Sequence, residues 1–317
     1  MTNANRSIGL IVGCVVLIGA AHVVAQDWPQ WRGSDRDGKV AEFAAPETWP
    51  GALIKKWKTT VGSGDATPAL VGDKLYVFAR QGEDEVTLCL NAEDGKELWR
   101  DTYTAQAVTG AASRHPGPRS SPTVAKGKIV TLTENSVVGV GLADGKLLWQ
   151  LPFVPQRRAY NAATPIIDGQ TVIYTGAGRG TNAVKIEKQG DGFVIEELWS
   201  NSELAPQYNT PVLIDGLLFG LSNRGKLFCI NAKTGQTAWT DETSLDRKGF
   251  GAIVHAGSTL LALTSNSELV TFAPSDKQFT ELARIKVADT STYAHPVIAG
   301  NRIFVKDQDA VTMWTIK

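Results

Sequence analysis

A sequence phrase that recurs along the chain constrains its fold more than any other feature. Most copies open on a Thr-Pro or Ser-Pro pair, pass a Gly turn into alternating β-branched and aromatic residues, and close on Gly-x-x-x-Trp. The copies begin at Thr67, Ser121, Thr164, Thr210, Gly251 and His295. Their starts lie roughly 40–55 residues apart, which is the period of a four-stranded propeller blade. The repeat therefore predicts an all-β propeller.

Each copy divides into four short antiparallel strands. Proline is tolerated at the first residue of a strand, because its missing N–H is not needed there. The third strand ends in an Asn-Ala-x-x-Gly turn, whose glycine supplies a positive φ. The fourth strand carries a tryptophan that is predicted to pack between blades and to bury roughly 200 Å². The structural tryptophans predicted in this way are Trp57, Trp99, Trp149, Trp199 and Trp239.

The last copy has only three strands, predicted at residues 296–299, 302–306 and 310–316. Alone it would expose an unpaired sheet edge, which proteins normally cover. Residues 53–60 form a fourth strand with its Trp but have no three strands before them. We therefore expect this N-terminal strand to pair with the C-terminal blade and close the ring. The result is a six-bladed propeller of four-stranded antiparallel blades over residues 53–317.

Two cysteines lie within the repeats. Cys89 and Cys229 occupy equivalent third-strand positions in the first and fourth copies, and hence opposite sides of a six-fold ring. A disulfide requires Cα atoms within about 7 Å. We therefore expect both thiols to be free and buried.

The N-terminus has the pattern of an export signal over residues 1–25. Arg6 precedes an apolar run over residues 8–24, and Ala25 offers a cleavage site. No membrane span then remains after cleavage. Two alternatives stay open: an uncleaved membrane anchor, and lipidation at Cys14. Residues 26–52 are expected to pack on the propeller, and Trp28 and Trp31 are favoured as packing residues over an exposed docking motif.

The blade phrases resemble the pyrroloquinoline-quinone (PQQ)-like, or BamB-like, propeller repeat. The opening Asp-Trp-Pro-Gln-Trp-Arg-Gly over residues 27–33, followed by Arg-Asp-Gly at 36–38, also resembles a bacterial envelope subgroup of these proteins. That resemblance implies export to the periplasm or cell envelope of a bacterium, often without an assigned activity. The chain differs from the assembly lipoproteins of this kind in having fewer blades and no clear lipid box.

Several function classes are disfavoured by composition and motifs. Lys plus Arg and Asp plus Glu balance at 32 each, so no basic field attracts nucleic acid. PQQ dehydrogenases resemble one another in a Cys-Cys pair that this chain lacks, and its blade tryptophans are committed to packing. His115, His255 and His295 have no further ligand at metal-binding spacing. We therefore predict no catalytic residue, no metal and no cofactor.

The remaining chemistry is binding. Loops that lead into first strands converge on one mouth of the channel, together with loops between second and third strands. They carry the Tyr, Arg and Asn that are typical of recognition surfaces. The predicted binding residues are Asp65, Arg119, Tyr160, Asn161, Arg179, Tyr208, Asn209, Arg224, Lys248, Phe250, Tyr293 and His295.

The sequence therefore predicts a monomeric, exported, non-catalytic scaffold that binds a protein, peptide or cell-envelope partner. The alternative is a propeller that binds a small ligand or sugar at the channel mouth. A PQQ-dependent dehydrogenase is the least favoured of the three.

Overall fold

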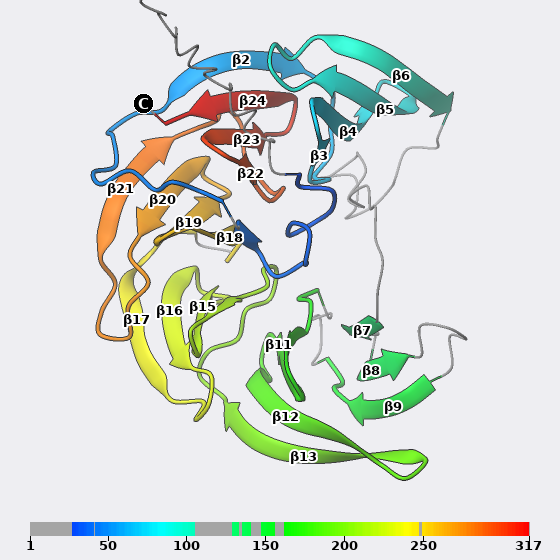
Figure 1. Cartoon of the computed structure of the whole chain (residues 1–317), viewed down its shortest axis with the longest axis vertical. Coiled ribbons are helices and arrows are strands. Elements are labelled where there is room, and N and C mark those ends of the chain that lie inside the picture. The colour runs from blue at the N-terminus through cyan, green and yellow to red at the C-terminus, as the bar shows by residue number, and fades with distance from the viewer. Residues whose placement is uncertain are drawn as a thin grey trace, which may run out of the picture.

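The computed structural model describes residues 27–316 apart from residues 41, 105–128, 133–134, 141–146, 156–161 and 247–248. Within this part of the chain the strands gather in six sheets around a common centre (Figure 1). None of the described residues forms a helix with the length and apolar character needed to span a bilayer. The chain is a six-bladed β-propeller, as its repeat predicts.

Blades 1 to 3 run in chain order from the innermost strand outward. Blade 1 consists of β3 (Ala69–Val71), β4 (Lys74–Gln81), β5 (Asp84–Asn91) and β6 (Glu97–Thr104). Blade 2 contains β7 (Ile129–Leu132), β8 (Ser136–Val140) and β9 (Leu147–Pro152), and its predicted first strand at Pro122 lies outside the described residues. Blade 3 consists of β10 (Ile166–Asp168), β11 (Thr171–Gly176), β12 (Gly180–Gln189) and β13 (Gly192–Asn201).

Blades 4 to 6 repeat this order, and the N-terminal part adds a strand to two of them. Blade 4 consists of β14 (Val212–Ile214), β15 (Leu217–Leu221), β16 (Lys226–Asn231) and β17 (Thr237–Ser244). Blade 5 consists of β18 (Gly251–Ala256), β19 (Thr259–Thr264), β20 (Glu268–Phe272) and β21 (Glu281–Lys286), with β1 (Lys39–Val40) beside β18. Blade 6 consists of β22 (Val297–Ala299), β23 (Arg302–Lys306), β24 (Ala310–Thr315) and β2 (Ile54–Thr60).

The predicted pairing of the two ends of the chain is confirmed. Strand β2 lies antiparallel to β24, with Ile54 opposite Thr315 and Thr60 opposite Ala310. The outermost strand of blade 6 therefore comes from the N-terminal part of the chain, while its three inner strands come from the C-terminal part (Figure 1).

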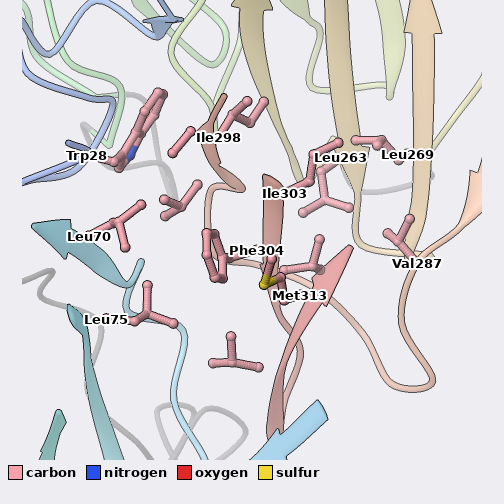
Figure 2. Packing of buried hydrophobic residues seen from close by; sticks show 14 of the residues in the cluster. Trp28, Leu70, Leu75, Leu263, Leu269, Val287, Ile298, Ile303, Phe304 and Met313 are labelled. Atoms are coloured by element: carbon pink, nitrogen blue, oxygen red, sulfur yellow. The ribbon is translucent and has the colours of Figure 1, made fainter. Parts of the chain in front are cut away.

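The largest hydrophobic cluster joins blades 5, 6 and 1. Phe304 and Met313 of blade 6 pack there with Leu70 and Leu75 of blade 1 (Figure 2). Trp28, which lies outside the repeats, belongs to the same cluster beside Leu70 (Figure 2). The N-terminal segment therefore contributes to the core of the ring.

A tryptophan on one blade and a turn on the next form a tie between blades. Trp199 on β13 donates its indole N–H to the carbonyl of Ala232 in blade 4 at 2.8 Å. Gly235 closes that turn by donating its N–H to the carbonyl of Asn231 at 2.8 Å, and its φ is +73°. A Cβ on Gly235 would lie 2.6 Å from the indole. The turn glycine thus makes room for the neighbouring ring.

The same tie joins blade 6 to blade 1. Trp57 on β2 donates its indole N–H to the carbonyl of Ala92 at 3.1 Å, and a Cβ on Gly95 would approach its ring to 2.5 Å. Blade 4 is joined to blade 5 by Trp239, whose indole N–H donates to the carbonyl of Ser275 at 2.7 Å.

Two tryptophans depart from this arrangement. Trp99 is 46 % exposed, and residues 141–146, where the sequence predicts the corresponding turn of blade 2, lie outside the described part of the chain. Trp149 is half-buried and packs against the cluster between blades 2 and 3. Blade 3 connects β12 to β13 through a long hairpin, with Gln189 opposite Gly192, instead of the Asn-Ala-x-x-Gly turn.

The two cysteines are as predicted. Cys89 on β5 and Cys229 on β16 are both free and fully buried. Burial raises the pKa of the Cys229 thiol to about 12, so this side chain stays neutral and acts as a small hydrophobic residue.

Candidate binding site at the loop face and central channel

The blades have two ends, which we call the loop face and the turn face. The loop face holds the loops that lead into first strands and the loops between second and third strands. The turn face holds the turns between first and second strands and between third and fourth strands. Most of the predicted binding residues belong to the loop face.

Three predicted binding residues form a continuous aromatic row on the loop face. The rings of Tyr208 and Phe250 stack with centroids 4.2 Å apart and planes 16° apart. The ring of Tyr293 meets Phe250 edge-on, with centroids 5.4 Å apart. Each residue lies just before the first strand of blade 4, 5 or 6, and each is half-buried. The row therefore spans three blades and leaves part of each ring accessible.

Asn209 and His295 were predicted in the same set, but their side chains are buried. Asn209 Nδ2 donates to the carbonyl of Leu221 at 2.6 Å, and its Oδ1 accepts the Leu221 N–H at 3.3 Å. The His295 ring meets Trp31 edge-on, with centroids 5.3 Å apart. Burial, and secondarily the nearby Arg32 guanidinium, lower the pKa of His295 to about 3. Asn209 therefore ties the loop before blade 4 to the second strand of that blade, and His295 packs against the plug.

Arg179 and Arg224 lie in loops between second and third strands. Arg179 Nη1 donates to the carbonyl of Phe153 in blade 2 at 2.7 Å, and its guanidinium lies 3.8 Å from the Phe153 ring centroid. This arginine therefore connects blades 2 and 3. Arg224 is exposed on the loop face of blade 4.

Asp65 is half-buried before the first strand of blade 1, near a buried lysine. Lys306 Nζ donates to the carbonyls of Gly62 at 3.0 Å and Gln308 at 3.2 Å. Burial lowers the pKa of Lys306 to about 8, while the carboxylates of Asp307 and Asp65 oppose that shift. Lys306 thereby ties the chain after β2 to blade 6.

Four predicted binding residues lie outside the described part of the chain. They are Arg119, Tyr160, Asn161 and Lys248.

The N-terminal segment over residues 27–40, which we call the plug, enters the centre of the ring (Figure 1). At the turn face, Asp27 Oδ1 accepts the Gly72 N–H at 2.7 Å. Trp28 then pairs with Leu70 on β3, its N–H donating to the Leu70 carbonyl at 2.8 Å and its carbonyl accepting at 2.9 Å. The chain thus runs inward from the turn face along the innermost strand of blade 1.

Arg32 holds the tip of the plug. Its guanidinium, in a residue only 1 % exposed, donates to the carbonyls of Thr210 at 2.7 Å and Pro211 at 2.9 Å. It also donates to the carbonyls of Arg36 at 3.1 Å and Asp37 at 3.0 Å within the plug. Burial lowers the pKa of Arg32 to about 10. Because Thr210 and Pro211 immediately precede β14, the tip reaches the loop-face end of blade 4.

The plug then returns toward the turn face along blade 5. The Gly38 carbonyl accepts the His255 N–H at 2.8 Å, and β1 lies parallel to β18 with Val40 opposite Ala256. A Cβ on Gly38 would lie 3.2 Å from Val212, so the segment passes close to blade 4 as well. The plug therefore contacts the innermost strands of several blades.

A cavity of about 420 Å³ lies beside the plug tip, against the innermost strand of blade 3. It is lined by Trp31, Arg32, Asp35, Arg36, Asp37, Val130, Thr164, Pro165, Ile166, Ile167 and Thr210. Its volume lies in the range of ordinary ligand pockets. Both the plug and blades 2, 3 and 4 form its walls.

Two plug residues beside the channel, Trp28 and Arg32, are not free to hold a bound quinone. A planar tricarboxylate held there needs an open stacking tryptophan and free cationic donors. Trp28 is buried in the core, and the Arg32 guanidinium is already bonded to four carbonyls. Within the described ranges, no three His, Cys, Asp or Glu side chains gather in a way that could hold a metal ion.

Comparison with known proteins gives a consistent family. Residues 38–241 match the family model described as outer membrane protein assembly factor BamB. The protein of that name from Yersinia pestis is 24 % identical over 315 residues, covering 88 % of this chain and 76 % of the relative. Its namesake from Bordetella pertussis is 23 % identical over 308 residues, covering 89 % of this chain and 72 % of the relative.

Solved structures also resemble the chain at low identity. BamB from Moraxella catarrhalis gives a TM-score of 0.40 with 12 % identity, over 84 % of this chain and 98 % of that one. The computationally designed Ika8 protein gives 0.48 with 10 % identity, over 88 % of this chain and 99 % of that one.

Proposed function

This chain belongs to the family described as outer membrane protein assembly factor BamB, and we propose from that membership that it is a non-catalytic binding factor for outer membrane protein assembly. Curated relatives at 23–24 % identity carry the same description. The proposal assigns no catalytic residue, no metal and no cofactor. It also locates the protein in the bacterial envelope, exported by a signal over residues 1–25.

The aromatic row on the loop face is the observation that carries this proposal. Tyr208, Phe250 and Tyr293 join three blades into one apolar strip with polar edges. Aromatic rings that bring large contact area at small entropy cost dominate binding energy at protein interfaces. Exposed Asn223 and Arg224 lie on the same face and supply a polar rim. A surface of this kind suits a protein or peptide partner of the envelope.

The buried members of the predicted set take a different role in this proposal. Asn209 and His295 support the face from inside and are not contact residues. Arg179 connects two blades through Phe153. The contact set is therefore the aromatic row with Asp65 and Arg224, together with the predicted residues outside the described part.

Site-specific photo-crosslinking in the native envelope tests the proposal. A benzophenone amino acid replaces Phe250 on the loop face, and a matched control replaces Lys233, which is exposed in a turn on the turn face. We expect discrete crosslinked envelope proteins from position 250 and none of the same proteins from position 233. Equal crosslinking from both positions, or from neither, contradicts a loop-face partner.

A second measurement tests the assembly role itself. Phe250→Ala removes the central ring of the row, while the control Phe279→Ala removes a half-buried ring of blade 5 that packs against Phe272 and Trp239, away from the loop face. We expect Phe250→Ala to lower the amount of folded outer membrane protein with little change in Tm. Unchanged outer membrane protein levels at a normal cellular level of the variant would contradict the role.

A further inference from the structure

The innermost strand of each blade has one edge that faces the channel. In blades 1, 3 and 5 the first two strands join through a two-residue turn, with Val71 opposite Lys74, Asp168 opposite Thr171, and Ala256 opposite Thr259. Such a closing pair exchanges hydrogen bonds across the hairpin. The residue before it therefore turns its N–H and C=O away from the second strand and toward the channel. These residues are Leu70, Ile167 and His255.

Two of these three edges are already paired by the plug. Leu70 exchanges both backbone hydrogen bonds with Trp28, at 2.8 and 2.9 Å. The His255 N–H donates to the Gly38 carbonyl at 2.8 Å, and β1 continues that pairing. The protein thus shows, with its own chain, that an extended segment can be added to the channel edge of a blade.

The third edge faces the cavity. Strand β10 is the first strand in the order of its sheet, and Ile167 is 51 % exposed although it lies on an innermost strand. The equivalent Leu70 of blade 1 and Ile298 of blade 6 are fully buried. The cavity of about 420 Å³ lies directly against Thr164, Ile166 and Ile167. Ile167 therefore combines an exposed apolar side chain with a backbone edge that faces the channel, next to a cavity that could hold an added strand.

We infer that the channel edge of β10 binds an extended segment of a partner protein by strand addition, between the plug tip and blade 3. Strand addition uses main-chain hydrogen bonds for affinity and alternate side chains for specificity. Ile166, Ile167 and Val130 favour β-branched side chains on the segment. The exposed carboxylates of Asp35, at the cavity, and Asp168, at the end of β10, favour a flanking lysine or arginine. This inference rests on the proposed function, because it supplies the mode by which a partner segment is held.

Fluorescence anisotropy with the full-length protein tests the inference. The probe is a fluorescein-labelled peptide of sequence Lys-Val-Thr-Val-Thr-Lys, and its control is the same peptide with every backbone amide methylated. We expect saturable binding of the first peptide and a loss of about tenfold or more in affinity for the second, because methylation removes the ladder donors. Equal affinity for the two peptides, or no binding of either, overturns the inference.

A matched pair of variants at one position locates the edge. Ile167→Pro removes the N–H that faces the channel, a change that an edge strand tolerates. Ile167→Thr also shortens the apolar side chain but keeps that N–H. We expect Ile167→Pro to abolish peptide binding and Ile167→Thr to keep it within a few-fold of the unmodified protein. Equal binding by the two folded variants contradicts strand addition at β10. If Ile167→Pro has a much lower Tm than the unmodified protein, the comparison of the two peptides on the unmodified protein tests strand addition instead.

The two proposals fail separately. Crosslinks from position 250 without peptide binding would contradict strand addition at β10 but support the loop-face partner. Peptide binding without such crosslinks would leave the β10 edge as a binding site and remove the loop-face proposal. The Phe250→Ala variant should bind the peptide with unchanged affinity, since its ring does not line the cavity.

Discussion

A buried arginine is one of the contacts that hold the N-terminal segment in place. Moving a guanidinium out of water is costly unless its N–H groups are all bonded. Arg32 meets this condition with four carbonyls, two from blade 4 and two from the plug. It does so from a left-handed backbone conformation, with a φ of +66°. The guanidinium is therefore held by backbone carbonyls, while the nearby Asp37 carboxylate opposes the lowering of its pKa by burial.

Replacing Arg32 should destabilise the fold selectively. Arg32→Ala leaves the carbonyls of Thr210 and Pro211 buried without donors, and each such group costs about 1–3 kcal/mol. Arg36→Ala is the matched control, because Arg36 is exposed and its Nε donates to Gln30. Urea unfolding should show a clear loss of free energy for the first variant and less than about 1 kcal/mol for the second. Similar losses for both would show that Arg32 does not hold the plug.

His295 should make the fold sensitive to acid. Its pKa falls from 6.5 to about 3 on folding, so between these pH values the unfolded chain binds a proton that the folded chain excludes. The stabilisation from neutral His295 is complete above the unfolded pKa and is lost as the pH falls, by up to about 1.4 kcal/mol per pH unit. Unfolding at pH 7 and pH 4.5 should show a smaller acid loss for His295→Gln than for the unmodified protein. Identical losses would mean that His295 is accessible to protons.

At the scale of the element, the turn and the tryptophan were both predictable, but their contact was not. The repeat predicts that Gly235 supplies a positive φ and that Trp199 packs between blades. It does not show that the glycine of one blade is the surface on which the tryptophan of the preceding blade lies. That relation depends on how adjacent blades pack. Trp149 has no such turn beside it, because the neighbouring blade has a long hairpin where the motif would stand.

A comparison of two glycines separates backbone strain from this contact. Gly235 and Gly216 have nearly equal φ values of +73° and +78°. A Cβ on Gly216 meets nothing within 4 Å, whereas a Cβ on Gly235 would approach the Trp199 ring to 2.6 Å. Gly216→Ala should therefore cost about 1–2 kcal/mol, the ordinary cost of a left-handed alanine. Gly235→Ala should cost more, as an overpacked site adds about 1–3 kcal/mol. Equal losses of unfolding free energy for the two variants in urea would show that the Trp199 indole moves aside at little cost.

For the whole molecule, the periodicity of the sequence predicted the repeated blades but not the position of the N-terminal segment outside them. The blade count and the partner of residues 53–60 follow from the phrase and from the need to cover a sheet edge, and both are confirmed. The position of the plug could not be predicted from the sequence, because residues 26–52 lie outside the repeat and no sequence pattern indicates which residues they contact. Trp28 and Trp31 of that segment were predicted to pack, but only the folded propeller shows that the segment lies in the channel.

The aromatic row illustrates the same limit for the site. Tyr208, Phe250 and Tyr293 were predicted on one face because each precedes a first strand. Asn209 and His295 share that position in the sequence but turn inward: Asn209 bonds to the backbone of Leu221, and the His295 ring packs against Trp31 of the plug. Position along the repeat predicts the face of the propeller, whereas the direction of each side chain depends on the neighbouring blade.

The occupied centre of the ring leads to a prediction for the whole protein. Incubation with PQQ and Ca²⁺ should give no dye-reducing activity above that of heat-denatured protein, because residues 28–40 pass through the space that a planar cofactor would take. A standard artificial electron-acceptor assay measures this. Saturable activity that depends on both additions would show that the segment leaves the channel.

The shared sheet of β2 and β24 also bears on how the protein is made. During synthesis residues 54–60 leave the ribosome long before residues 310–315, so β2 must wait for the strand with which it pairs. Contacts this distant in sequence are formed late, since the chain must first lose the entropy of a long loop. Until then the amphipathic N-terminal strand offers bare backbone to any protein nearby. The new chain is therefore open to wrong pairing by β2 until the hairpin of β23 and β24 has formed.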